Sequence, residues 1–228
     1  MTPPPYPRWR SWLSYLADHT LERGEGEHGD ELAVLLRKGK VLLQSNGAIY
    51  SWEDNYYNFR TAFERTEWRR LPGTRCLLLG LGLGSVPQII EERFGIDLEY
   101  VAVEYDAAVA QLAEDYLLYR LRSPITTVVA DAEAFVAQCD ERFDLVLVDI
   151  FVDDEVPRQF DSVAFAKTLA ELTVPGGLVI SNRLTHRDHD RTATAAYYRD
   201  VWRAVFPQGG YLDVESNWML FSDGQYLE

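Results

Sequence analysis

Short apolar runs alternate with amphipathic stretches along most of this chain. The apolar runs are bounded by turn residues, which is typical of strands covered on both faces. They occupy residues 76–79, 100–103 and 143–148, and residues 125–129 and 178–182 are two further predicted strands. Stretches with helical spacing lie between or after them, at residues 107–118, 161–172 and 191–205, and residues 211–214 and 218–221 form a closing hairpin pattern. This order predicts an α/β, Rossmann-like fold with a mostly parallel seven-stranded sheet, helices on both faces and a last antiparallel strand.

The first part of the chain has a different period. Residues 32–36, 41–44 and 48–52 are strand-like runs joined by tight turns, the second of them Asn46-Gly47, and they predict two successive hairpins. Residues 53–64 begin a helix that leads into the main sheet. We therefore expect an N-terminal helix and a small antiparallel β appendage within residues 1–70, and the Rossmann-like domain within residues 71–228.

An aromatic stripe begins the chain. Trp9, Trp12, Leu13 and Leu16 recur at helical spacing, which predicts a short amphipathic helix. Such a stripe packs either on its own domain or on a second subunit, so a homodimer is one expectation. Residues 24–30 are glycine-rich and predict a loop.

A glycine loop follows the first buried strand. Gly80, Gly82 and Gly84 are separated by leucines, and Ser85 is a candidate helix N-cap ahead of the next helical run. Glycines allow a tight turn and the close approach of a ligand, and the helix N-terminus adds N–H donors. Glu104 follows the second strand and could accept hydrogen bonds from a ribose diol. The strand, glycine loop, helix and acid favour a nucleotide site over an ordinary turn. The G-x-G-x-G spacing resembles the S-adenosylmethionine loop of class I methyltransferase-like folds more than a pyrophosphate loop.

Three acids stand at the carboxyl ends of consecutive strands. They are Glu104, Asp131 and Asp149. Ligands of open α/β sheets bind at that edge, where Asp131 could accept from an adenine amino group and Asp149 could face the reacting end. Each acid taken alone could equally be a helix cap or a solvated loop residue.

Composition narrows the classes of function. The 228 residues carry a formal net charge of −14, which argues against nucleic-acid binding and would favour a cationic small substrate. No apolar run is long enough for a transmembrane helix, the first residues lack the apolar core of a secretory signal, and Cys76 and Cys139 have no metal-ligand spacing. We expect a cytoplasmic protein with no membrane partner and no metal.

The sequence resembles the polyamine aminopropyltransferases, that is, spermidine and spermine synthases and their relatives. The matching stretches are KVLLQSNGAIYSWEDNYYNF, LLLGLGLGSVP, VAVEYD, VVADAEAFV, FDLVLVDIFVDDEVP and FDSVAFAKTLAELTVPGGLVISN, in collinear order over residues 32–222. The VDxFxxxxVP pattern at residues 148–157 is the most specific piece. The resemblance implies a class I methyltransferase-like fold with a small β domain, often dimeric.

The resemblance also implies roles for individual residues. Glu104 would bind the ribose hydroxyls, Asp131 and Ala132 the adenine, and the loop of Gly80, Gly82 and Gly84 would face the nucleoside. Asp149 matches the catalytic aspartate, which would accept a proton from an amine such as putrescine as it attacks decarboxylated S-adenosylmethionine, with Tyr57 as a helper.

The part of the family pattern that would bind the amine acceptor is altered in this sequence. Ser85 and its neighbours replace an aspartate-containing loop, Tyr50 follows Asn46-Gly47 where the family has a glutamine, and Phe59 replaces a glutamate. Two alternatives therefore stay open beside aminopropyl transfer. One is an S-adenosylmethionine-dependent methyltransferase of a small molecule, and the other is a non-catalytic protein that binds an adenosyl ligand. A dehydrogenase ranks below these, for lack of the dinucleotide spacing.

Overall fold

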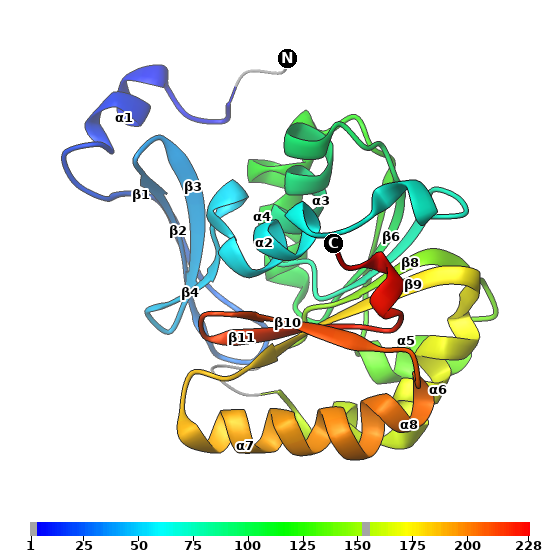
Figure 1. Ribbon diagram of the computed structural model, residues 1–228. Helices are drawn as coiled ribbons and strands as arrows, with labels where there is room; N and C mark the ends of the chain where they lie inside the picture. Colours follow the sequence, from blue (N-terminus) through cyan, green and yellow to red (C-terminus); the bar gives the residue numbers. More distant parts are fainter. Residues whose placement is uncertain (1–3, 152–155) are drawn as a thin grey trace.

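The molecule contains two β-sheets that lie next to each other (Figure 1). The computed structural model describes residues 4–151 and 156–228. The smaller sheet is a four-stranded antiparallel meander in the order β1-β2-β3-β4. Its strands are β1 (His19–Glu25), β2 (Glu31–Arg37), β3 (Lys40–Ser45) and β4 (Ala48–Ser51). The two predicted hairpins are confirmed, and they share a strand.

The larger sheet has seven strands in the order β10-β11-β9-β8-β5-β6-β7. Its strands are β5 (Arg75–Leu79), β6 (Glu99–Glu104), β7 (Ile125–Val129), β8 (Phe143–Val148), β9 (Thr173–Leu184), β10 (Gly210–Val214) and β11 (Asn217–Phe221). Strands β5 to β9 pair in parallel, and β11 is inserted antiparallel between β9 and β10. The predicted fold class is confirmed.

Helices cover both faces of the larger sheet (Figure 1). They are α2 (Tyr57–Glu64), α3 (Ser85–Gln88), α4 (Ala107–Tyr116), α5 (Ala132–Gln138), α6 (Val163–Leu172), α7 (Asp188–Tyr197) and α8 (Arg203–Val205). Helix α1 (Arg8–Leu13) lies instead beside the smaller sheet. A π-helical turn at Ile89–Arg93 continues α3, and another at Tyr198–Trp202 joins α7 to α8. Short 3₁₀ turns lie at Glu53–Asn55, Trp68–Arg70, Leu118–Arg120, Arg158–Asp161 and Gly224–Tyr226.

The central strands bury both of their faces. In β5, Cys76 and Leu78 belong to the core on the side of α2 and α3, whereas Leu77 and Leu79 belong to the core under α5 and α6. Successive side chains of a strand point to opposite faces, so an uninterrupted apolar run is needed where both faces are covered. Each fully buried leucine contributes about 2 kcal/mol relative to an exposed one.

The smaller sheet packs on the glycine loop and on α4. One face of this sheet, formed by Leu32, Val34, Leu36, Val41 and Leu43, makes a cluster with Leu83, Val109 and Leu112. Helix α2 instead packs its Phe59 and Phe63 into the core of the larger sheet. The proposed boundary at residue 70 stays a prediction. Within the described ranges, no helix is long and apolar enough to cross a membrane.

Three elements differ from the sequence prediction. Strand β1 occupies residues for which no strand was predicted, and it includes part of the predicted loop, because it is mostly exposed and polar and lacks an apolar period. Helix α1 ends at Leu13, so Leu16 lies beyond it. In β9, the segment between Thr173 and Leu178 pairs irregularly with β8, and regular pairing resumes at Leu178. The sequence predicted a turn in this irregular segment.

Candidate functional site

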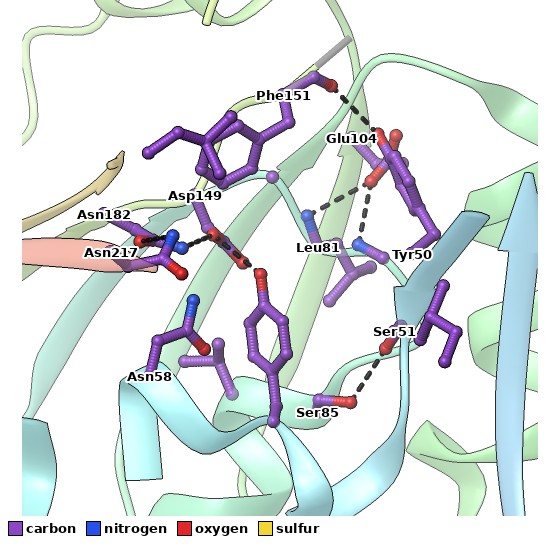
Figure 2. Close-up of a pocket in the computed structure, with 16 residues that line it drawn as sticks. Tyr50, Ser51, Asn58, Leu81, Ser85, Glu104, Asp149, Phe151, Asn182 and Asn217 are labelled. Carbon is purple, nitrogen blue, oxygen red and sulfur yellow. Dashed lines mark hydrogen bonds between the residues drawn. The ribbon is translucent and has the colours of Figure 1, made fainter. Parts of the chain in front are cut away.

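Two adjoining cavities open at the carboxyl edge of the larger sheet. The larger has a volume of about 790 Å³, and the smaller, shown in Figure 2, has about 220 Å³. Both are lined by Tyr50, Gly80, Glu104, Asp149 and Phe151. The strand order explains why these residues meet, because β8, β5 and β6 lie next to one another in the sheet and end at the same edge.

The glycine loop is shaped by the protein around it. All three glycines have positive φ, and a Cβ at Gly80 would overlap the carbonyl oxygen of Asp149. Gly80 and Gly82 line the cavities, whereas a Cβ at Gly84 would meet Leu118 Cδ2 at 2.5 Å. The structure therefore brings two of the three predicted glycines to the cavities, and Gly84 faces the core.

Ser85 has a different role from the predicted one. Gly84 is the N-cap of α3, and Ser85 is the first helical residue. Its hydroxyl lies 2.8 Å from that of Ser51 in β4 (Figure 2). This buried contact fixes the glycine loop to the smaller sheet.

Glu104 is held by backbone donors from two segments. Its Oε2 accepts from the N–H groups of Leu81 and Gly82 at 3.1 and 2.9 Å, and its Oε1 accepts from those of Tyr105 and Asp106 at 2.9 and 3.2 Å. The residue is 3% exposed, and burial raises the pKa of its carboxyl while the four N–H groups oppose that rise. Glu104 thus closes the glycine loop onto the end of β6 (Figure 2).

Asp149 lies between the two cavities at the end of β8. Its Oδ1 accepts from Tyr56 Oη at 3.0 Å and from Asn182 Nδ2 at 2.9 Å. Burial raises the pKa of Asp149 to about 6, the negative charge of Glu104 adds to the rise, and the two hydrogen bonds oppose it. A buried carboxyl with such a pKa can hold or release a proton near neutral pH.

The tyrosine beside Asp149 is Tyr56, not Tyr57. Tyr57 is 44% exposed, and the Arg60 guanidinium lies 5.0 Å from the centre of its ring. It lines neither of the two cavities. The two tyrosines are adjacent at the start of α2, and the sequence pattern could not tell which of them turns inward.

The larger cavity holds the remaining predicted residues. Asp131 and Ala132 line it, and Asp131 also caps α5 by accepting from the Ala134 N–H at 2.9 Å. Val103, Ile150 and Phe160 contribute apolar surface. On the rim, the rings of His28 and Tyr105 stack with their centres 4.2 Å apart.

Several lining residues were not predicted as functional. Asn182 lies near the carboxyl end of β9, at the same edge as Glu104 and Asp149, so the rule that found those acids could have found it. Asn217 stands at the start of an antiparallel strand, where that rule does not apply. Conversely, Phe59 is fully buried in the core of the larger sheet and lines neither cavity.

The family pattern VDxFxxxxVP is only partly described. Residues 152–155 lie outside the described residues, whereas Asp149, Ile150 and Phe151 line the cavities. The phenol of Tyr50 donates to the Phe151 carbonyl oxygen at 3.2 Å, which joins the smaller sheet to this segment (Figure 2). Among the described side chains, no group of three or more His, Cys, Asp or Glu could hold a metal ion.

No family model matches the chain. It is 27% identical over 139 residues to a probable polyamine aminopropyl transferase of Bifidobacterium longum, and 24% identical over 140 residues to a polyamine aminopropyltransferase of Vibrio vulnificus. These matches cover 61% and 59% of this chain. They cover 30% and 46% of the relatives, so the aligned part is less than half of each relative's length.

Solved structures show the same fold. A probable spermidine synthase from Corynebacterium glutamicum has a TM-score of 0.72 at 18% identity, over 88% of this chain and 78% of that one. A spermidine synthase in complex with the transition-state analogue AdoDATO gives 0.68 at 15%, over 89% and 72%. Human methyltransferase-like protein 13 in complex with SAH gives 0.59 at 21%, over 77% and 84%. Together with the curated relatives, these likenesses confirm the resemblance found in the sequence: the sequence is similar to those of polyamine aminopropyltransferases, and the fold is similar to that of spermidine synthases.

Proposed function

We propose that the protein transfers an aminopropyl group from decarboxylated S-adenosylmethionine to an amine acceptor. The observation that carries this proposal is Asp149, a buried carboxyl with a pKa of about 6 between a larger and a smaller cavity. A general base works best when its pKa is near the working pH. The names of the curated relatives support the same reaction class.

The larger cavity suits the nucleoside. It combines an apolar wall with Glu104 for the ribose and Asp131 and Ala132 for the adenine. A carboxylate has about four acceptor positions, and those of Glu104 already take four N–H groups. A ribose diol that reaches Glu104 therefore replaces bonds to Leu81 or Gly82, and we expect nucleoside binding to reshape the glycine loop.

The reaction needs a neutral amine and a base. The sulfonium of the bound nucleoside supplies an electrophilic methylene carbon and leaves as a neutral thioether. As the acceptor nitrogen bonds to that carbon, the carbon–sulfur bond breaks and its electron pair goes to sulfur. Asp149 accepts the proton that the nitrogen loses, while Tyr56 and Asn182 keep its Oδ1 in place.

The charge around the loop favours the decarboxylated nucleoside. S-adenosylmethionine carries a carboxylate near its sulfonium, and that group needs donors or a cation. The N–H groups of Leu81 and Gly82 already bind Glu104, and Asp149 adds a second acid beside them. A further carboxylate would be repelled there, whereas the aminopropyl ammonium would be attracted.

The smaller cavity suits the acceptor amine. Besides Asp149 it presents the amides of Asn58, Asn182 and Asn217. Such groups hydrogen-bond an amine without adding charge. We propose a polyamine-type acceptor, as the names of the relatives suggest.

A thermal-shift comparison tests the proposal. Decarboxylated S-adenosylmethionine, methylthioadenosine, S-adenosylmethionine and S-adenosylhomocysteine are compared at equal concentration. A ligand at a hundred times its Kd adds about 2.7 kcal/mol, or about 5 to 10 °C in Tm for a domain of this size. We expect the first two to stabilise the protein more. Preference for the carboxylated pair would indicate methyl transfer, and no shift from any of the four would favour a protein without this chemistry.

We also propose that the protein forms a homodimer through α1 and the residues after it. Trp12 is 80% exposed and Leu16 is 86% exposed, and both are large apolar side chains. Burying such residues against a second copy would stabilise a dimer. Light scattering of the wild type and of Trp12→Ala, Leu16→Ser tests this, with a monomeric wild type as the contradicting result.

A further inference from the structure

We propose that Asn217 and Asn182 are positioning residues that hold Asp149 with Oδ1 engaged and Oδ2 turned to the acceptor. The proposal rests on the proposed function, because it concerns the same base. Asn217 Nδ2 donates to Asn182 Oδ1 at 2.8 Å, and Asn182 Nδ2 donates to Asp149 Oδ1 at 2.9 Å. Figure 2 shows the three side chains in a row.

Strand pairing places these residues together. In the parallel pair of β8 and β9, Val148 is opposite Ser181, so Asp149, the first residue after β8, comes next to Asn182, which is still in β9 and pairs there with Met219 of β11. In the antiparallel pair of β9 and β11, Asn217 is opposite Leu184. The inserted antiparallel strand is therefore what brings Asn217 to the site.

Asn217 determines which end of the Asn182 amide meets Asp149. The oxygen and nitrogen ends of an amide are similar in size, and hydrogen-bond partners decide its orientation. Because Asn217 donates to the oxygen, the NH₂ group of Asn182 faces the carboxylate. In the reverse orientation the Asn182 oxygen would face Asp149, and only a protonated carboxyl could make that contact.

The pair therefore tunes the protonation of Asp149. The other titratable groups that face Asp149 are Tyr56 beside α2, Tyr50 from β4 and Glu104 from β6. Burial raises the pKa of both phenols above 10, so they stay neutral in the working range, and Glu104 is held by four N–H groups. Of the groups that contact Asp149, the Asn182 amide is the one that a single substitution can turn around, so that its oxygen and not its NH₂ group faces the carboxyl.

The variant Asn217→Asp makes that inversion. A carboxylate at residue 217 accepts instead of donating, so the Asn182 NH₂ group turns toward it and the Asn182 oxygen turns toward Asp149. We expect the pKa of Asp149 to rise, the acid limb of the kcat/KM profile to move to higher pH, and kcat to fall about tenfold to a hundredfold. Asn217→Ala removes the donor without adding charge and should move the pKa in the same direction by less.

The pKa is read from ¹³C NMR of protein labelled at the aspartate carboxyl, with the signal of Asp149 assigned from the spectrum of Asp149→Asn. This readout needs no turnover, and the label leaves Glu104 silent. Ser216→Asp is the matched control, because it adds the same charge one residue away, next to His186. It should leave the profile unchanged.

The outcomes separate the two proposals. A raised pKa in Asn217→Asp and Asn217→Ala supports the positioning pair, and an unchanged pKa in both overturns it. If Asn217→Asp does not fold, Asn217→Ala decides alone. A wild type that turns over no aminopropyl donor refutes the proposed function, and the NMR titration still decides whether Asn217 acts on Asp149.

Discussion

Replacing Asp149 by asparagine should make the protein more stable while abolishing its turnover. The folded protein buries this carboxyl, which disfavours its charged form. An asparagine is neutral and nearly the same size, and its oxygen can still accept from Tyr56 and Asn182. The substitution therefore removes the buried charge and keeps both hydrogen bonds.

The size of the effect follows from the pKa of Asp149, which burial raises from 3.8 to about 6. Each factor of ten in proton affinity corresponds to about 1.4 kcal/mol, so the charged carboxylate destabilises the fold by about 3 kcal/mol. Below pH 3.8 the group is protonated in both states and this effect is absent. Between pH 4 and 6 the folded state holds a proton that the unfolded state releases, so stability falls as pH rises, and above pH 6 the full effect is present.

Urea unfolding of the wild type and Asp149→Asn at several pH values measures this difference. We expect the variant to be more stable by about 3 kcal/mol at pH 8, equivalent to about 6 to 12 °C in Tm, with a difference that shrinks toward zero at pH 4. Groups that do not interact with Asp149 titrate equally in both proteins and cancel. A variant that is less stable at pH 8, or a difference that does not change with pH, would refute the reasoning.

Three further predictions concern the surrounding residues. Tyr56→Phe should lower kcat about tenfold or more because Asp149 loses a donor, whereas Tyr57→Phe should leave steady-state rates unchanged; equal effects would contradict the assignment. Glu104→Gln should weaken methylthioadenosine binding by about 1 to 3 kcal/mol in calorimetry, and an unchanged Kd would remove Glu104 from the nucleoside site. Gly80→Ala should destabilise the protein by more kcal/mol in urea than Gly176→Ala, which has a similar φ but open space around it; equal losses would show that backbone conformation alone matters.

The fold was predictable because its core strands are continuous apolar runs. Residues 143–148 form a strand with the predicted bounds, and five of its six residues are buried because the strand is covered on both faces. Residues 125–129 also form a strand with the predicted bounds, although this edge strand is only partly buried. Strand β1 was missed for the opposite reason. It packs one edge against β2 and exposes most of its side chains, so burial leaves little trace in its sequence.

The sequence predicts the lining residues that stand at the carboxyl ends of the parallel strands. Glu104, Asp131 and Asp149 stand at the ends of three parallel strands of one sheet, and a parallel sheet brings such residues to the same edge whatever the connections between them. This rule about strand ends does not predict Tyr56 or Asn217. One depends on the rotation of a short helix and the other on the register of an antiparallel strand, and neither is encoded by local periodicity.

Product analysis tests the central claim most directly. The wild type and Asp149→Asn are incubated with putrescine and either decarboxylated S-adenosylmethionine or S-adenosylmethionine, and the products are identified by mass spectrometry. The proposed function predicts an aminopropylated acceptor and methylthioadenosine from the wild type with the decarboxylated donor alone, and no product from Asp149→Asn. A methylated acceptor from S-adenosylmethionine, or equal turnover by both proteins, would contradict it.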